Sequence, residues 1–476
     1  MVVSRRTMLL AGGAVAAGGV AIPASQHVAW GRRTFTRPDY DPDFPEAPEG
    51  EDSWMNWSGV QRATPEAISR PASEGALSAL VARTDSRIRP FGSGHSFVGL
   101  APSEGVMVDV SQMSGMRAID ADTGIAVFGA GTRLFQAATE LADAGRALPN
   151  LPDIDVQTLA GTFSTATHGT GETLTALHDH IAGFRMVTAA GDILDVTPDS
   201  NPDLFAAGRV SLGALGIITE YTLRTVPMFN LHRQVWVEPI GTLIERAEEY
   251  IQQHRNFEFY YFPNTGYGAG ISHDLHEGPV SGRGDNEDDS TLEELKALRD
   301  AVGWWPWMRR KIIGEALPKG MVEDVSDSSY KLLATTRPIK FNEMEYHLPR
   351  ENGIKGLKEV IAKLERHKEV FFPMEVRVIA PDDAWLSPFN AGPRMSIAIH
   401  AAVDEPYDYF FSEIEPIHRA NGGRPHWGKH HSLGKEELSA LYPRFGDFMA
   451  LRREMDPSGK FLNPHLAKLF GEAFDD

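Results

Sequence analysis

The stretch Arg89-Pro90-Phe91-Gly92-Ser93-Gly94-His95-Ser96-Phe97 decides which fold is predicted for this chain. It follows a predicted strand that begins at Ile88, and Gly92 and Gly94 allow the backbone to adopt positive φ angles. Successive N–H groups in such a turn form a concavity that binds an anion. The stretch matches neither the P-loop nor the Rossmann glycine pattern. It therefore predicts a phosphate-binding loop of another kind with His95 at its rim, although a glycine-rich turn with a surface histidine would have the same sequence.

A second stretch, residues 158–171, favours the ligand-binding interpretation. It contains six hydroxyl side chains, three glycines and one histidine, and it has no acidic or basic side chain other than that histidine. This composition is unlike that of a core helix. We therefore predict that the backbone and hydroxyl groups of this stretch line a large, polar, anionic ligand.

The composition is that of a soluble enzyme with two domains. The chain has 476 residues, of which 42% are hydrophobic and 23% charged. Its 46 basic and 65 acidic residues give a formal charge of −19, which argues against a nucleic-acid partner. The complete absence of cysteine excludes disulfides, thiolate metal ligands and a cysteine nucleophile.

The N-terminus resembles an export signal. Arg5 and Arg6 precede an apolar run that ends at Ile22 and is too short for a comfortable membrane span. We predict that residues 1–30 are a twin-arginine signal, so that the protein is periplasmic or secreted, or anchored on the outer face of the membrane if the signal is not cleaved. Residues 31–53 are rich in proline and acidic side chains and are predicted to be a linker or a surface arm.

The remaining pattern predicts short strands and helices in an α+β arrangement. In the first half we expect helices at 72–84 and 134–144, strands at 106–110 and 125–130, a hairpin at 181–188 and 193–197, and a glycine turn at 212–216 that leads into a strand. In the second half we expect strands at 257–263, 341–349, 374–378 and 396–403, and a solvated acidic loop at 281–294. The tryptophan-rich stretch 303–311 is predicted to be buried, with an exposed membrane or partner patch as the alternative.

Two charged clusters in the second half could be functional. Alternation along 374–378 places Glu375 and Arg377 on one face of a strand, which suits a surface ion pair as well as a site. The stretch 424–431 holds His426, His430 and His431, and this cluster leaves open a metal-dependent hydrolase or binding protein.

The glycine loop, residues 158–171 and the run His426-Trp427-Gly428-Lys429 together resemble the vanillyl-alcohol-oxidase type flavoproteins, and most closely their sugar-1,4-lactone oxidases and alditol oxidases. The resemblance runs from about Trp54 to the C-terminus. It implies a PCMH-type, two-subdomain FAD-binding domain at 54–228, an α+β cap domain on an antiparallel sheet at 229–420, and a segment at 421–476 that returns to the flavin.

The resemblance also implies the site residues. FAD would be joined covalently to His95, and Lys429, Arg377 and Glu375 would be catalytic, with no metal. The implied cofactor contacts are Pro90, Phe91, Gly92, Ser93, Gly94, His95, Ser96, Asp153, Thr158, Gly161, Thr165, Ala166, Thr167, His168, Ile218 and His426.

The expected reaction is oxidation of an alcohol carbon of a sugar lactone or related polyhydroxy compound, with hydride transfer to the flavin and reoxidation by O2 to give H2O2. A dehydrogenase with a quinone or cytochrome acceptor is the alternative. Asp153 and Ala402 replace a serine and a threonine of the alditol oxidases, so the substrate is not expected to be a simple open polyol. Pro152 beside the flavin is compatible with an oxidase.

Overall fold

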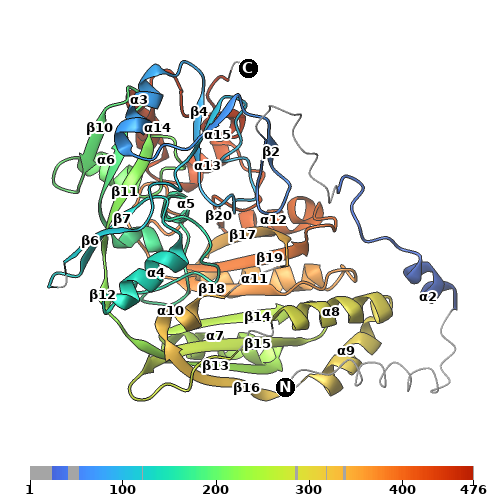
Figure 1. Cartoon of the computed structure of the whole chain (residues 1–476). Helices are drawn as coiled ribbons and strands as arrows, with labels where there is room; N and C mark the ends of the chain where they lie inside the picture. The colour runs from blue at the N-terminus through green and yellow to red at the C-terminus, as the bar shows by residue number, and fades with distance from the viewer. Residues whose placement is uncertain are drawn as a thin grey trace.

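A computed structural model describes residues 24–40, 53–120, 122–284, 288–317, 319–335 and 339–474. Arg5 and Arg6 of the predicted export signal lie outside the described residues. Figure 1 shows two layers of structure, an N-terminal part (residues 53–228) above a cap (residues 229–420), with the C-terminal segment folded back onto the N-terminal part.

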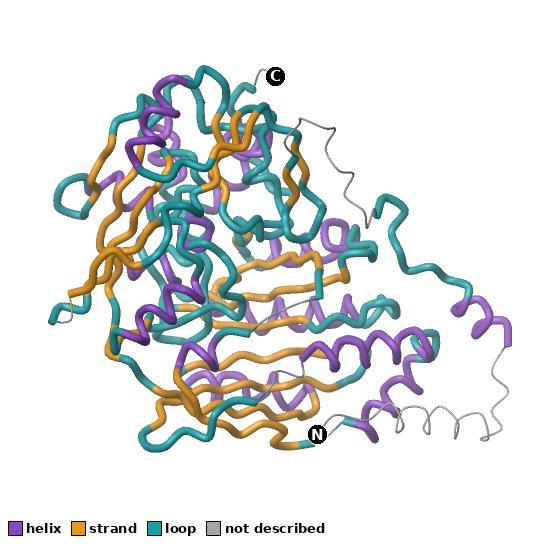
Figure 2. The backbone as a smooth tube through the Cα atoms, viewed as in Figure 1, coloured by secondary structure: helices purple, strands orange, loops and turns teal. Residues whose placement is uncertain are grey.

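The N-terminal part contains two main sheets (Figure 2). The smaller is parallel, with strand order β3 (Ala67–Ser69), β5 (Val106–Asp109) and β4 (Ile88–Phe91). The larger is antiparallel, with order β10 (Ile193–Val196), β9 (Ile181–Val187), β11 (Ile217–Arg224), β7 (Ile125–Gly129) and β6 (Met116–Asp120). The predicted hairpin is thus confirmed as β9 and β10, and the strand after the glycine turn as β11.

Short helices pack on these sheets as the sequence pattern indicates. Helix α3 (Glu74–Arg83) begins at the N-cap Ser73, whose side chain accepts a hydrogen bond from the Ala76 N–H, and it buries Leu77, Leu80 and Val81. Helix α4 (Leu134–Asp143) also matches its prediction. The other elements of this part are α5 (Leu159–Ser164), η1 (Leu177–His180), α6 (Pro202–Gly208), β1 (Trp54–Met55), β2 (Arg62–Ala63), β8 (Arg146–Ala147) and β12 (Val226–Pro227).

The cap is built on one eight-stranded antiparallel sheet. Its order is β16 (Gly320–Ser328), β13 (Asn230–Pro239), β15 (Tyr267–His276), β14 (Asn256–Phe262), β18 (Met374–Ile379), β19 (Arg394–Ala402), β17 (Phe341–Pro349) and β20 (Arg424–Pro425). The α+β prediction with an antiparallel cap sheet is therefore confirmed. The described cap also contains the helices α7 (Ile240–Gln253), α8 (Asp288–Val302), α9 (Pro306–Ala316), α10 (Ser329–Leu333), α11 (Arg350–Leu364) and α12 (Glu415–Ala420) and the π-helical turn η2 (Phe410–Ile414).

Three predictions about the cap need comment. The aromatic strand β14 is sheet core as predicted, because Phe257, Phe259 and Tyr261 are all buried. The predicted loop 281–294 is wrong at its end, since helix α8 (Asp288–Val302) begins within it, and residues 285–287 lie outside the described part. The predicted burial of the tryptophan-rich stretch is half right. Trp304 and Trp305 are half-buried, and their ring centroids are 5.5 Å apart. Trp307 on helix α9 (Pro306–Ala316) is 59% exposed.

The segment before the N-terminal part is more ordered than predicted. Residues 24–30, expected to belong to a signal outside the fold, form with Gly31 the helix α2 (Ala24–Gly31) beside α8. Trp30 is buried there and its indole N–H donates to the carbonyl of Arg299 at 3.1 Å. Among the described residues, no helix combines the length and apolar character needed to cross a membrane.

The C-terminal segment packs back against the glycine-loop strand, as Figure 1 shows for the helices α13 (Lys435–Leu441), α14 (Phe445–Met455) and α15 (Pro464–Phe470). The Ile88 N–H donates to the carbonyl of Lys460 at 2.8 Å, and the Arg89 guanidinium donates to the carbonyl of Phe461 at 2.7 Å. The C-terminal segment thereby fixes β4, from which the glycine loop starts.

Candidate functional site

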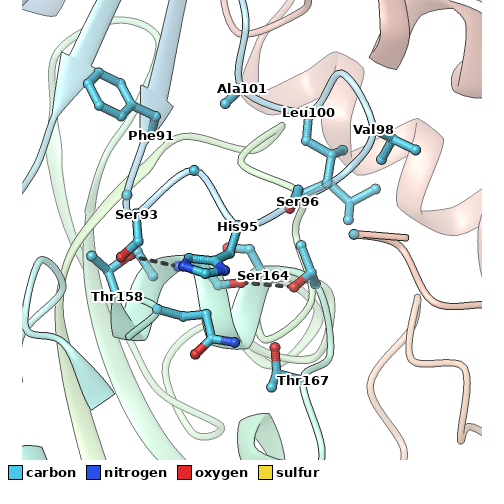
Figure 3. A pocket seen from close by; sticks show the side chains of 18 of the residues that line it. Phe91, Ser93, His95, Ser96, Val98, Leu100, Ala101, Thr158, Ser164 and Thr167 are labelled. Atoms are coloured by element: carbon cyan, nitrogen blue, oxygen red, sulfur yellow. Dashed lines mark hydrogen bonds between the residues drawn. The ribbon is translucent and has the colours of Figure 1, made fainter. Parts of the chain in front are cut away.

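One large pocket lies between the N-terminal part and the cap. Figure 3 shows His95, Thr158, Ser164 and Thr167 around it. The glycine loop forms one wall, and strands β17, β18 and β19 of the cap sheet form another. The sequence stretches singled out above, which are up to several hundred residues apart, thus meet at one place.

The glycine loop is shaped to receive a ligand. A Cβ added to Gly92 would lie 2.1 Å from Thr158 Oγ1, and Gly94 has φ +68°, so both positions require glycine. None of the backbone N–H groups of residues 92–96 donates a hydrogen bond to another described residue. Unpaired backbone donors beside a pocket are the chemistry of a phosphate cradle.

Arg89, in the strand before this loop, holds the loop in place. Its buried guanidinium donates to the carbonyls of Leu100, Leu212, Gly213 and Phe461 at 2.6 to 3.1 Å. These carbonyls come from three separate segments of the chain. Burial lowers the pKa of Arg89 to about 9, so it is still cationic at neutral pH.

The hydroxyl-rich stretch faces the glycine loop and contains a short helix that the sequence did not predict. Residues 159–164 form the short helix α5, because Thr158 is its N-cap and accepts a hydrogen bond from the Gly161 N–H at 3.3 Å. Beyond α5, Ala166 adopts a left-handed conformation with φ 60°. Thr165, Thr167 and His168 line the pocket, whereas Ala166 does not.

His95 projects into the pocket (Figure 3). Its ring stacks on Trp57, with the ring centroids 5.0 Å apart. Burial, together with the positive charges of Lys429 and Arg133, lowers the pKa of His95 to about 4. The imidazole is therefore neutral near pH 7 and has a nitrogen lone pair available for bonding.

An ion pair joins the cap to the C-terminal segment at the pocket. Lys429 Nζ pairs with Glu343 on β17, and His400 Nε2 lies 3.7 Å from the other oxygen of the same carboxylate. Burial works against the charge of Glu343, but Lys429 and His400 lower its pKa to about 2. Lys429 is thus held as a cation beside the pocket.

A second buried pair lies further along β17. His168 Nε2 is 2.9 Å from Glu345 Oε1, and His168 Nδ1 is 2.8 Å from the carbonyl of Gly169. Both ring nitrogens therefore face acceptor oxygens, which fixes the orientation of the ring. Burial opposes the charge of Glu345, yet His168 and His426 hold its pKa well below the usual range.

His426 adjoins this pair as a neutral ring. Burial lowers its pKa to about 3, and the Gly428 N–H donates to His426 Nδ1 at 3.0 Å, which leaves Nε2 as the protonated nitrogen. Atoms of His168, Glu345 and His426 lie within 4.8 Å of one another. Among the described residues, His430 and His431 do not join such a group, so the histidine cluster of the metal hypothesis is not assembled.

Glu375 and Arg377 form a buried pair, not a surface one. The Arg377 guanidinium pairs with Glu375 and also donates to Glu258 at 2.9 Å, and Tyr260 donates to Glu375. Both side chains are less than a tenth exposed. Burial, opposed by Arg377 and reinforced by Glu258 and Asp153, raises the pKa of Glu375 to about 7.

The pocket contains every predicted site residue except Ala166. It also contains Glu343 and Glu345, to which the sequence analysis gave no role, although their alternation along 341–349 with His347 on the same face was a signal. Pro152 and Asp153 line the pocket, and the Thr335 hydroxyl donates to Asp153 Oδ1 at 3.0 Å. Ala402, expected in the pocket, borders a neighbouring cavity instead.

Comparisons with known proteins agree with this geometry. The profile of the D-arabinono-1,4-lactone oxidase family matches residues 221–469, and an FAD binding domain matches residues 65–197. The chain is 35% identical to L-gulono-1,4-lactone dehydrogenase of Mycobacterium tuberculosis over 434 residues, covering 88% of this chain and 99% of the relative. It is 29% identical to L-gulonolactone oxidase of Bos taurus, covering 88% of this chain and 98% of the relative. It is 28% identical to alditol oxidase of a Streptomyces species, covering 87% of this chain and 98% of the relative.

Among solved structures, cholesterol oxidase from Brevibacterium sterolicum superposes with a TM-score of 0.71 at 16% identity, covering 90% of this chain and 99% of that one. This likeness concerns the fold. The residues around the pocket fit FAD. The free N–H groups of the glycine loop suit the pyrophosphate of FAD, and the polar groups of residues 158–171 suit a cofactor of that length.

Proposed function

Because this chain belongs to the D-arabinono-1,4-lactone oxidase family, we propose that it oxidises a sugar 1,4-lactone, or a related polyhydroxy compound, at a CH–OH carbon with FAD as cofactor. The single observation that supports this most is the composition of the pocket. The glycine loop with His95, the cap residues Glu375 and Arg377, and Lys429 of the C-terminal segment all line it.

The residues of the chain supply the acid–base and electrostatic part of the reaction. FAD, when bound, supplies the hydride acceptor. Lys429 and Arg377 are cations that stabilise negative charge developing on the substrate oxygen. Glu375, whose pKa is raised to about 7, is the residue suited to take the hydroxyl proton. Its partner Tyr260 and the neighbouring Arg377 fix its orientation.

His168 lies on the β17 side of the pocket, where the Glu345 carboxylate fixes its ring. His426, protonated at Nε2, offers a neutral donor beside it. Glu343 and Glu345 therefore act as positioning residues for Lys429 and His168.

Covalent attachment of FAD to His95 is part of the proposal. It is supported by the neutral state of the imidazole and by its stacking on Trp57, which fixes the ring. The test is to precipitate the holoprotein with acid and record flavin fluorescence in pellet and supernatant. Flavin should stay in the pellet of the wild type and appear in the supernatant of His95→Ala. Flavin in the supernatant of both proteins would disprove the linkage while leaving the binding site intact.

The substrate class and the electron acceptor are tested with a panel of 1,4-lactones and the matching alditols. Relatives of this chain are named for L-gulonolactone, L-gulono-1,4-lactone and alditols, and Asp153 in the pocket favours a lactone over an open polyol. We expect turnover with 1,4-lactones to exceed turnover with the matching alditols. Measuring H2O2 with oxygen, and dye reduction without it, distinguishes the oxidase from the dehydrogenase alternative. Preference for open alditols would refute the lactone assignment.

The N-terminal sequence supports export by the twin-arginine route, to the periplasm or outside, with retention as an anchor as the alternative. Replacing Arg5 and Arg6 by lysines should leave active, flavin-loaded protein in the cytoplasm, and cell fractionation measures this. Unchanged distribution of the variant would refute the route.

A further inference from the structure

The guanidinium of Arg377 on β18 is shared by two carboxylates, only one of which lines the pocket. Its Nε donates to Glu258 Oε2 at 2.9 Å, and its Nη2 donates to Glu375 Oε1. Arg377 and Glu375 line the pocket, whereas Glu258, on the neighbouring strand β14, does not. In the described part of the chain, Glu258 forms an ion pair with Arg377 alone. The carboxylate of Glu258 is therefore tied to the site although it is not part of the pocket wall.

The aromatic strand β14 places Glu258 there by alternation. The buried aromatic side chains of β14 occupy every second position, so Glu258 and Tyr260 share the other face of the strand. Tyr260 is paired with Glu375 across the antiparallel strands β14 and β18, and the same register continues to Glu258 opposite Arg377. Strand pairing thus brings two side chains of β14 against the two charged side chains of β18.

Two carboxylates beside one guanidinium carry one negative charge in excess when both are ionised. The side chain of Glu258 is 12% exposed, and those of Arg377 and Glu375 are less than a tenth exposed. An unbalanced charge in such surroundings costs stability, which packing alone would not favour. The excess disappears when one of the two carboxyl groups takes up a proton. The group is therefore built to hold one proton.

Glu375 is the carboxyl group that holds this proton. Burial, aided by the negative charges of Glu258 and Asp153, raises the pKa of Glu375 to about 7. The positive charges of Arg377 and His400 act in the opposite direction. The other titratable side chains that contact Glu375 or line the same pocket on the neighbouring strands and the C-terminal segment are Tyr260, Glu343, Glu345 and Lys429.

The hydrogen bonds leave one oxygen of Glu375 for the reaction. Oε1 accepts from Arg377 Nη2 and from the Tyr260 hydroxyl. Counting only residues that the structure describes, no side chain or backbone group donates to Glu375 Oε2, and none accepts from Arg377 Nη1. Oε2 is thus the atom suited to receive the hydroxyl proton, and Nη1 is the donor suited to meet the substrate oxygen.

We propose that Glu258 is a positioning residue of the reaction. Through Nε it holds the guanidinium of Arg377 in the orientation that leaves Nη1 for the substrate. Its negative charge also offsets the guanidinium charge, which would otherwise hold Glu375 ionised and make it a weaker base. This inference rests on the proposed function, because it takes Glu375 as the base that receives the proton of the lactone hydroxyl.

The decisive variant is Glu258→Gln, because the amide oxygen still accepts from Arg377 Nε while the negative charge is lost. Anaerobic stopped-flow reduction of the flavin by lactone, measured against pH, gives the titration midpoint of the base. We expect this midpoint, about 7 in the wild type, to fall by about one unit or more in Glu258→Gln. The matched control is Glu323→Gln, which neutralises a carboxylate of β16 paired with Arg233 in the same sheet. Its midpoint should equal that of the wild type.

Infrared spectroscopy follows the same carboxyl group without turnover. A protonated-carboxyl band that titrates near pH 7 in the wild type and is missing in Glu375→Gln belongs to Glu375. This band should titrate at lower pH in Glu258→Gln, by the same amount as the kinetic midpoint. Glu258→Asp retains the charge and should retain the wild-type midpoint, so it separates the charge of residue 258 from its packing.

The outcomes distinguish this proposal from the function on which it rests. An unchanged midpoint in Glu258→Gln would overturn the role of Glu258, and so would an equal fall in Glu323→Gln. A fall in Glu258→Asp as large as that expected for Glu258→Gln would also overturn it, even if Glu258→Gln did not fold. Failure of the lactone to reduce the flavin would instead refute the proposed function, while the infrared titration would still decide whether Glu258 controls Glu375.

Discussion

Replacing Lys429 by methionine removes the cation from the Glu343 ion pair while keeping most of the side-chain volume. Glu343 is 5% exposed, and in the wild type its pKa is about 2 instead of the ordinary 4.5. A difference of this size corresponds to about 3 kcal/mol of folding free energy at neutral pH, since a tenfold change in proton affinity is about 1.4 kcal/mol. Lys429→Met should therefore be less stable at pH 7 by about 3 kcal/mol, within the range for a broken buried pair.

The sign of the pH dependence follows from the direction of the pKa change. Glu343 contributes stability that is present above its unfolded pKa and is lost as pH falls toward about 2. The difference between wild type and variant should therefore shrink on acidification. The double variant Lys429→Met, Glu343→Gln has no stranded charge and should recover most of the lost stability at pH 7.

Activity separates the electrostatic role of Lys429 from its structural one. Loss of a positioned cation should lower kcat/KM for the lactone by about two to four orders of magnitude in the single and the double variant alike. Urea unfolding followed by tryptophan fluorescence and steady-state kinetics on the same samples measure both quantities. Recovery of activity along with stability in the double variant would show that Lys429 only balances charge, and would refute the reasoning.

Three further predictions concern other parts of the account. Gly92→Ala should lower the flavin content of the purified protein, because the new Cβ would meet Thr158 Oγ1 at 2.1 Å and obstruct cofactor loading, whereas Gly446→Ala, with open space around it, should load flavin normally. The rate of flavin reduction by lactone should rise with pH through about pH 7 in the wild type, and Glu375→Gln should abolish this rise. A rise that persists in the variant would show that another residue is the base. Trp30→Ala should expose α2 to limited proteolysis without changing flavin reduction by lactone, and an unchanged digestion pattern would contradict the packing of that helix.

The sequence allowed prediction of those site residues that lie in locally recognisable patterns. The glycine loop around His95 and the hydroxyl stretch ending at His168 have compositions that few structural roles explain, and both line the pocket. Glu375 and Arg377 were found by strand alternation, but alternation could not tell a surface pair from a buried one. That distinction depends on Glu258 and Tyr260, which β14 brings beside β18.

What sequence analysis missed depends on contacts between distant parts of the chain. In the sequence, Glu343 is indistinguishable from an ordinary strand residue. Its role depends on Lys429, which is 86 positions away and pairs with it only in the folded chain. Helix α2 looked like the end of a signal because the carbonyl that holds Trp30 belongs to Arg299, 269 positions away. Helix α5 was missed for a local reason: Thr158 caps it, and a six-residue helix is too short to show a periodic pattern.

The most direct test of the central claim is anaerobic mixing of the flavin-loaded protein with D-arabinono-1,4-lactone or L-gulono-1,4-lactone while the visible absorbance of oxidised flavin is recorded. The account predicts that a 1,4-lactone bleaches this absorbance and that Lys429→Met bleaches far more slowly. A fully loaded protein whose flavin no 1,4-lactone reduces would contradict it.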